Sequence, residues 1–159
     1  MEIERKFLLD PAAIPYNLKE HQQTEMVQAY ISVDPVIRIR KENERHVLTI
    51  KGNGDLAREE HELILEERQF KNLIPLVNVN STPIQKTRTS IFVEEKIIYE
   101  IDVYYNLLEG LATVEVEFPS VSDANRFIPP SWFGRELTYD KSYGNASLSF
   151  NGLPKDFLL

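Results

Sequence analysis

The chain has 159 residues, of which 42% are hydrophobic and 27% charged, with a formal net charge of −7 and no cysteine. This length and composition fit one globular domain spanning residues 1–159, and they exclude a disordered chain, disulfides, thiolate metal ligands and a cysteine nucleophile. The acidic balance argues against duplex nucleic acid as a partner, because duplex binding usually needs a strongly basic face.

Alternation of apolar and polar residues with a period of two dominates the chain and predicts eight strands. In chain order they cover 2–8, 25–32, 36–42, 46–52, 58–65, 84–93, 96–105 and 112–118. The links are short and contain turn residues, such as Asp34-Pro35 and Gly52-Asn53-Gly54. Short links of this kind favour antiparallel neighbours, because a parallel crossover needs a dozen or more residues.

Helices are predicted to be few. The main one covers 66–74, where Phe70, Leu73 and Ile74 share one side and Pro75 ends the helix. Shorter helical pieces are expected near 11–20, 121–128 and 139–147. The combination predicts a mainly β (α+β) fold, a closed eight-stranded antiparallel barrel with peripheral helices that lie outside it or plug one end. A flat open sheet would leave two long edges unprotected.

The predicted strands concentrate their charges on one face, because side chains at i and i+2 of a strand point the same way. These faces carry Glu2, Glu4 and Lys6; Arg38 and Arg40; Thr49 and Lys51; Arg58, Glu60 and Glu62; Lys86 and Arg88; Glu100 and Asp102; and Glu115 and Glu117. The opposite faces are largely apolar, as with Ile37 and Ile39. The charged faces could surround an apolar barrel in solvent, or they could line its interior.

Two observations favour the interior. Like charges occur in pairs, and two of them about 7 Å apart on one strand face repel by roughly 2 kcal/mol at an effective dielectric near 20. A solvated face has no need of such pairs. The charged faces also contain almost no Ser, Asn or Gln, the residues that usually fill an outer face. We therefore expect the charged side chains to converge on an enclosed channel.

A charged interior requires a ligand, because buried charge needs pairing or coordination. Carboxylate oxygens without sulfur ligands indicate Mg²⁺ or Mn²⁺, with Ca²⁺ as an inhibitor. Arginine and lysine side chains suit phosphate oxygens. Together they indicate a metal-bound polyphosphate.

The ordered series of charged pairs from residue 2 to about 118 resembles the CYTH superfamily of triphosphate tunnel metalloenzymes. The resemblance implies an eight-stranded antiparallel barrel whose tunnel holds a triphosphate with one or two divalent metal ions. It also implies the small, single-domain prokaryotic type, without an appended helical domain. Known activities of the family are inorganic tripolyphosphatase, thiamine triphosphatase, one class of adenylate cyclase and RNA triphosphatase.

The resemblance also implies roles for individual residues. Phosphate binding falls to Lys6, Arg38, Arg40, Lys51, Arg58, Lys86 and Arg88, with Lys141 on a plug helix. Metal ligation falls to Glu2, Glu4, Glu115 and Glu117, supported by Glu60, Glu62 and Asp102. For catalysis we expect Lys6 and Arg40 to stabilise developing charge, and Glu4 or Glu60 to accept a proton from the attacking water.

The leading hypothesis is a metal-dependent hydrolase that converts inorganic tripolyphosphate to pyrophosphate and phosphate, with weaker action on nucleoside triphosphates. Adenylate cyclase and thiamine triphosphatase are alternatives that use the same channel. A non-catalytic polyphosphate binder is a further alternative, although a pure anion binder would gain little from so many acids. Trp132 and Phe133 are expected to anchor a loop rather than stack a base.

Location and assembly follow from weaker signals. No apolar run approaches the length of a membrane span, so no membrane partner is expected. The charged pattern begins at residue 2, which leaves no room for a signal peptide, and a cytosolic location is the default expectation. An unequal outer apolar face would allow a homodimer.

Overall fold

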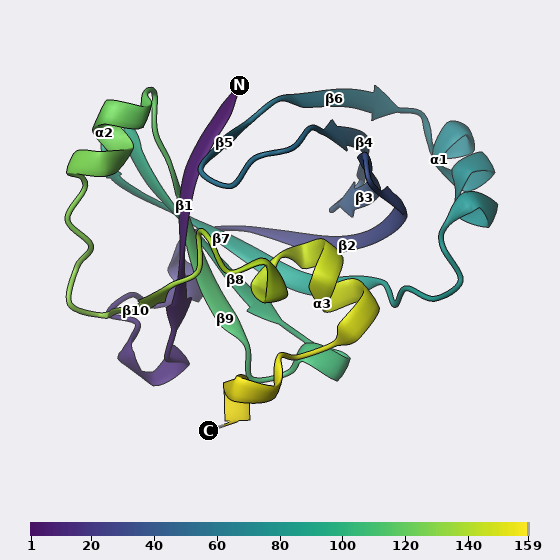
Figure 1. The fold of residues 1–159 in the computed structure, drawn as a ribbon. Helices are drawn as coiled ribbons and strands as arrows, with labels where there is room; N and C mark the ends of the chain where they lie inside the picture. Colours follow the sequence, from purple (N-terminus) through teal and green to yellow (C-terminus); the bar gives the residue numbers. More distant parts are fainter. Residues whose placement is uncertain (159) are drawn as a thin grey trace.

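The computed structural model describes residues 1–158 as one antiparallel sheet that curls into a nearly closed barrel (Figure 1). The strands are β1 Glu2–Leu9, β2 Gln22–Val33, β3 Val36–Glu42, β4 Arg45–Lys51, β5 Ala57–Arg58, β6 Glu60–Leu65, β7 Ile84–Glu94, β8 Ile97–Tyr104, β9 Ala112–Glu117 and β10 Phe133–Glu136. Their order is β10-β1-β9-β8-β7-β2-β3-β4-β6, and β5 pairs with β1. The predicted antiparallel, mainly β architecture is confirmed.

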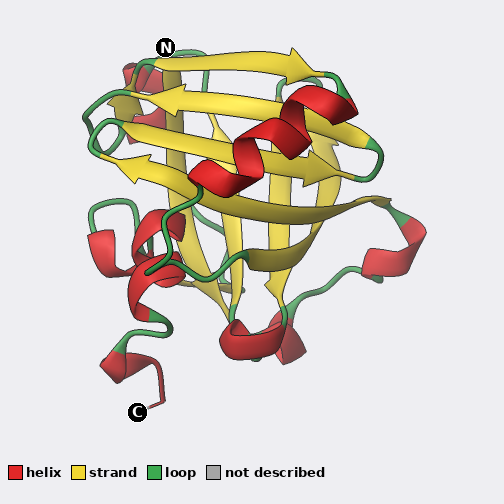
Figure 2. Cartoon of the chain, turned by 90° about the vertical axis from the view of Figure 1, so that its right-hand side faces the viewer, coloured by secondary structure: helices red, strands yellow, loops and turns green. Residues whose placement is uncertain are grey.

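Three short α-helices surround this sheet: α1 Glu67–Leu73, α2 Val121–Arg126 and α3 Asn145–Asn151. Single 3₁₀ turns occur at Pro11–Ala13, Leu18–Glu20, Ile74–Leu76, Asn106–Leu108, Lys141–Tyr143 and Lys155–Leu158. The helix α1 lies across the outside of β4 and β6 (Figure 2), α2 packs on β1, and α3 packs on β2 and β7. No helix in residues 1–158 is long and apolar enough to cross a membrane.

The four predicted helical segments all contain helical turns. The segment 66–74 is α1, and a 3₁₀ turn continues it past Pro75, which the first turn of a helix tolerates. The segment 121–128 contains α2, whose first turn is capped by Ser120. The segments 11–20 and 139–147 contain short 3₁₀ turns, and the second of them also holds the start of α3.

The barrel is closed by a very short strand pairing. The predicted strand 58–65 is interrupted at Glu59, and only the two-residue strand β5 reaches β1, through Glu2 opposite Arg58 and Ile3 opposite Ala57. The other half of β1 pairs with β10, a strand that the alternation did not predict. The eight predicted strands therefore form the ring, and β10 extends the sheet outside it.

The largest apolar cluster lies outside the barrel. Phe7, Ile101, Val114 and Val116 point outward from β1, β8 and β9, and each is at least 98% buried. The helix α2 and the segment 127–133 cover them. Within that segment the ring of Trp132 packs against Phe133, with centroids 4.7 Å apart. Trp132 thus anchors the loop before β10, as expected, whereas Phe133 packs on the same cluster as the first residue of β10.

The interior changes character along the strands. Near one end, the inward positions become apolar: Leu8 follows Lys6, Val36 precedes Arg38, Ile84 precedes Lys86 and Tyr104 follows Asp102. These side chains belong to a second apolar cluster that includes Leu148 of α3. The helix α3 therefore closes the apolar end of the barrel, and the charged part of the interior remains as a cavity.

The apolar core on the outer face of the barrel strands leads to a testable prediction. Ile101→Ala should lower the free energy of unfolding by about 2–5 kcal/mol, because the fully buried side chain would leave a cavity. Ile128→Ala is the matched control, since Ile128 is 86% exposed and its loss should cost little. Urea unfolding of both variants measures the difference, and equal effects would contradict an outer core.

Candidate active site

The interior of the barrel contains a cavity of about 980 Å³. Among its lining residues are Glu2, Glu4, Lys6, Arg38, Arg40, Lys51, Arg58, Glu60, Glu62, Arg88, Glu115, Glu117 and Lys141. These are all of the predicted site residues except Lys86 and Asp102. The charged faces of the strands thus point inward, as their alternation predicted.

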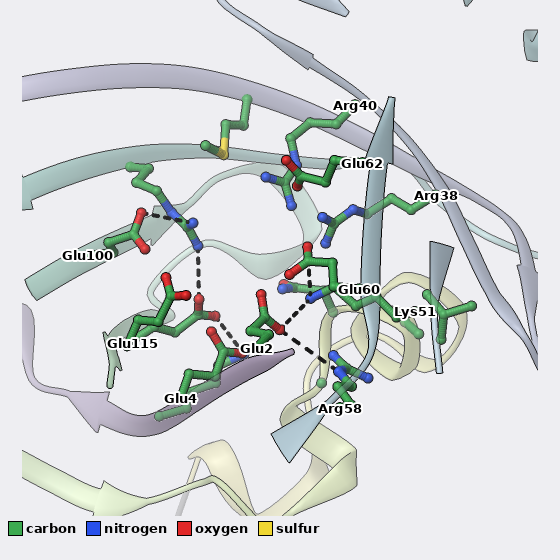
Figure 3. A pocket seen from close by; sticks show the side chains of 18 of the residues that line it. Glu2, Glu4, Arg38, Arg40, Lys51, Arg58, Glu60, Glu62, Glu100 and Glu115 are labelled. Carbon is green, nitrogen blue, oxygen red and sulfur yellow. Dashed lines mark hydrogen bonds and ion pairs between the residues drawn. The ribbon is translucent and has the colours of Figure 1, made fainter. Parts of the chain in front are cut away.

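Carboxylates gather on one side of the cavity. We call this side the acidic wall: Glu2 and Glu4 from β1, Glu100 from β8, and Glu115 and Glu117 from β9. Strand pairing brings them together, because Glu4 lies opposite Glu117 and Glu100 lies opposite Glu115. Figure 3 shows Glu2, Glu4, Glu100 and Glu115 converging from this side.

Cations face them from the other side. The basic wall consists of Arg38 and Arg40 from β3 and Lys51 from β4, and all three residues are more than 90% buried. The Nη2 of Arg38 donates to the Thr49 hydroxyl at 3.3 Å, whereas its buried Nε–H has no partner within residues 1–158. Burial and the neighbouring Arg38 lower the pKa of Arg40. Arg38 and Arg40 repel each other, and the free donor of Arg38 makes this part of the wall suited to an anionic ligand.

Arg88 is bound to carboxylates rather than free. Its Nε and Nη2 donate to Asp102 at 2.8 Å each, Nη1 donates to Glu100 at 3.1 Å, and Nη2 also donates to Glu115 at 3.1 Å. The side chain lines the cavity, but its donors are directed at the acidic wall. Arg88 therefore holds Glu100 and Glu115 in place.

Lys86 and Asp102 lie behind the cavity surface. Lys86 Nζ donates to Asp102 at 2.8 Å, and neither side chain has exposed area. Burial lowers the pKa of Lys86 to about 7 against the attraction of Asp102. Although burial opposes ionisation, Arg88 and Lys86 hold the pKa of Asp102 well below its usual range. The pair reaches the cavity only through Arg88.

The acidic wall has the donor chemistry of a site for a hard cation. Burial and the nearby Glu115 and Glu2 raise the pKa of Glu4 to about 8, and burial also raises the pKa of Glu100 and of Glu117. Within residues 1–158, no three such side chains already converge as a ready-made metal site. A divalent cation bound here would nonetheless relieve the repulsion, and carboxylate oxygens are the ligands that Mg²⁺ and Mn²⁺ prefer.

Ion pairs cross the short closure of the barrel. Lys51 Nζ lies 3.1 Å from Glu2 and 3.9 Å from Glu60, and Arg58 Nε lies 4.0 Å from Glu2. Burial and a hydrogen bond to Glu2 raise the pKa of Glu60 to about 8. These contacts join β1 to β4, β5 and β6 at the edge of the cavity, where the ladder supplies only two residue pairs.

The turn Lys141–Tyr143 and the helix α3 form a plug at the apolar end of the barrel, and this plug also contributes to the cavity. Lys6 Nζ donates to the backbone carbonyl of Tyr143 at 2.9 Å and lies 3.9 Å from Glu115. The Tyr104 hydroxyl donates to Asn145 at 2.7 Å, which fixes the start of α3. Lys141 is exposed and lines the cavity from the turn before α3. Lys6 therefore connects the first strand to the plug as well as facing the cavity.

Several lining residues escaped the sequence analysis. Glu42 and Arg45 continue the alternation of the predicted strands and could have been found by extending it. The inward face of β2 offered no such signal, because it carries no charge: the lining residues there are Gln22, Thr24, Met26 and Tyr30. Glu100 was recognised in the charged series but was given no role.

The site and the fold define a class: a barrel whose enclosed interior sets carboxylates against arginine and lysine, as a metal-bound polyanion requires. The family model for the CYTH domain matches residues 1–142. This chain belongs to the CYTH domain family, as the resemblance implied.

Two curated proteins are similar over nearly their full length. An inorganic triphosphatase of Nitrosomonas europaea is 37% identical over 153 residues, covering 94% of this chain and 97% of that protein. An inorganic triphosphatase of Acetivibrio thermocellus is 28% identical over 151 residues, covering 94% of each. A crystal structure of the inorganic triphosphatase NE1496 superposes with a TM-score of 0.68 at 33% identity, covering 97% of both chains.

Arg38 is a buried cation whose Nε–H has no hydrogen-bond partner within residues 1–158, and this predicts an unusual effect on the free energy of unfolding when it is replaced. Arg38→Met should leave the free energy of unfolding of the ligand-free protein unchanged or raised, because it removes a buried cation that repels Arg40. Arg5→Met is the matched control. Arg5 donates to Glu136 at 2.7 and 2.9 Å and to two backbone carbonyls, and its loss should cost about 3 kcal/mol. Urea unfolding compares them, and a large loss at Arg38 would contradict this description of the wall.

Proposed function

We propose that this protein is an inorganic triphosphatase that hydrolyses tripolyphosphate to pyrophosphate and phosphate with the help of a divalent cation. The observation that carries the proposal is the opposition of the acidic and basic walls across one enclosed cavity. The near full-length similarity to two proteins named inorganic triphosphatase supports it.

Substrate binding begins at the basic wall. Arg38, Arg40 and Lys51 supply positive charge from residues that are more than 90% buried, and such charge interacts with phosphate oxygens more strongly than it would in water. Arg58 and Lys141 also line the cavity and extend this binding. Lys86 and Arg88 were also expected to bind phosphate, but their contacts favour an indirect role through the carboxylates.

Metal binding belongs to the opposite wall. We assign Mg²⁺ or Mn²⁺, as one or two ions, to Glu2, Glu4, Glu115 and Glu117, with Glu60 and Glu62 as neighbours on β6 and Asp102 acting through Arg88. A bound ion would neutralise phosphate charge and lower the pKa of a water molecule. Ca²⁺ is larger and more loosely coordinated, and we expect it to inhibit.

Hydrolysis then requires only bond exchange at the terminal phosphorus. The oxygen of a water molecule forms the new bond to phosphorus, the bond to the bridging oxygen breaks, and pyrophosphate leaves. Lys6 and Arg40 stabilise the charge that develops on the phosphoryl and leaving oxygens. Glu4 and Glu60 both line the cavity and remain the two alternatives for accepting the water's proton.

The cavity favours inorganic triphosphate over a nucleotide or thiamine triphosphate. Within residues 1–158, the one aromatic side chain that lines it is Tyr30, which is 98% buried. A base or thiazolium ring would therefore find little surface on which to stack. The scarcity of aromatic surface supports inorganic triphosphatase over the two alternatives, adenylate cyclase and thiamine triphosphatase. A cytosolic location and a homodimer stay predictions from the sequence.

Product analysis tests the proposal directly. The pure protein is incubated with tripolyphosphate, ATP or thiamine triphosphate in the presence of Mg²⁺ or Mn²⁺, and every product is identified. We expect pyrophosphate and phosphate from tripolyphosphate, at a rate well above that with the other two substrates. Cyclic AMP from ATP would indicate the cyclase instead, and no turnover of any substrate would indicate a binding protein.

The basic wall should be essential for turnover. Arg40→Ala should lower kcat by about 100-fold or more, because a preorganised cation next to the reacting phosphate is lost. The control is Arg126→Ala on α2, whose side chain is 73% exposed. Lys6→Ala should also remove most activity, but it additionally releases the Tyr143 carbonyl of the plug. Steady-state kinetics with folded protein measures these effects, and near wild-type activity of Arg40→Ala would refute the assignment.

The acidic wall should set the metal requirement. Glu117→Gln should raise the Mg²⁺ or Mn²⁺ concentration needed for half-maximal activity by about tenfold or more, since one carboxylate ligand is replaced by a neutral amide. Glu67→Gln is the control, because Glu67 is exposed on α1 and pairs with Lys71. If metal titrations of the two variants coincide, Glu117 is not a ligand.

A further inference from the structure

A glutamine inside the barrel contacts the basic wall without lining the cavity. Gln28 lies on β2 directly opposite Arg40 on β3, and it is 1% exposed. Its Oε1 accepts from the Nε–H of Arg40 at 3.1 Å, and its Nε2 donates to the Tyr30 hydroxyl at 3.4 Å. A buried amide with both ends occupied has one orientation, because the arginine can only donate and so must face the amide oxygen.

Arg40 is consequently held at two of its three nitrogens. Gln28 accepts from Nε, and the carboxylate of Glu42 accepts from Nη1 at 3.0 Å. Among residues 1–158, no hydrogen-bond partner is found for its Nη2. Figure 3 shows the Arg40 side chain reaching into the cavity. The plane of a guanidinium is fixed once two of its nitrogens are engaged, and the remaining donors then have a defined direction.

We propose that Gln28 is a positioning residue for Arg40: it fixes the guanidinium plane so that the free donors of Arg40 face the triphosphate, and it does not touch the substrate itself. This inference rests on the proposed function. A neutral amide suits the task because it accepts a hydrogen bond without cancelling the charge of Arg40. A second carboxylate beside Glu42 would fix the same plane but would neutralise the cation and repel an anionic substrate.

The test uses two substitutions at position 28 and one control. Gln28→Met keeps the length of the side chain and removes the acceptor, whereas Gln28→Glu keeps the acceptor and adds a negative charge. The control is Gln23→Met on the outer face of the same strand, where Gln23 donates to the Thr89 hydroxyl at 3.0 Å. Binding of tripolyphosphate is measured by calorimetry without metal, alongside kcat and KM with Mg²⁺.

We expect Gln28→Met to weaken binding of tripolyphosphate roughly tenfold, the effect of losing one hydrogen bond to a charged group. Gln28→Glu should weaken binding at least as much, and Gln23→Met should bind as the wild type does. In an Arg40→Lys background, Gln28→Met should change the affinity less than about twofold, because lysine has no Nε–H to be positioned. A merely structural role would lower affinity equally in both backgrounds, and that result would overturn the inference, as would unchanged binding of Gln28→Met.

Failure of this inference can be separated from failure of the proposed function. If the wild-type protein neither binds nor hydrolyses tripolyphosphate, the proposed function is wrong whatever the variants do. Hydrogen exchange at the Arg40 Nε–H, followed by NMR, tests positioning without any substrate. We expect exchange to be slow in the wild type and faster in Gln28→Met. Equal exchange rates in the wild type and in Gln28→Met would show that Gln28 does not hold Arg40.

Discussion

Charge enclosed in the barrel is the constraint to which the rest of the structure responds. An interior occupied by arginine, lysine and glutamate cannot supply an apolar core, so the core must form elsewhere. It forms on the outside of β1, β8 and β9 under α2, and at the end of the barrel under α3. The marginal stability of a small protein leaves little tolerance for unpaired buried charge. Two carboxylates of the acidic wall therefore pair with basic side chains: Glu115 with Lys6 and Arg88, and Glu2 with Lys51.

The arginines of the cavity have two different kinds of environment. In the part of the chain that the structure describes, Arg38 makes a single hydrogen bond, to a threonine, whereas Arg88 makes four, all to carboxylates. Both residues appear in the sequence as one member of a basic pair on a strand, and both line the cavity. What separates them is the neighbouring strand: β4 presents Thr49 to Arg38, while β8 and β9 present acids to Arg88. A cation is available to a substrate only where its own neighbours leave it unpaired.

Much of this architecture could be predicted from the sequence, because alternation with a period of two specifies which side chains share a face. It correctly indicated the strands, their inward charge and most of the charged lining residues. Alternation does not specify depth, so Lys86 and Asp102 were placed in the cavity although they lie behind it. It is also uninformative where a lining strand is uncharged, as in β2, or where a strand has only four residues, as in β10. Alternation also does not explain why the inward positions change from charged to apolar near Leu8 and Ile84. The reason is tertiary, because α3 covers these positions.

The position of the plug in the sequence affects the order in which the parts of the cavity form during synthesis. The strands that supply both walls end at Glu117, but the floor of the cavity comes from Leu137 to Ser147, near the end of the chain. The first strand must also wait for its partners β5, β9 and β10, which are distant in sequence. A ribosome-bound chain that has exposed only its first hundred residues thus has charged strands without an enclosed interior. A triphosphate can meet a complete pocket only after the residues up to Ser147 have left the ribosome.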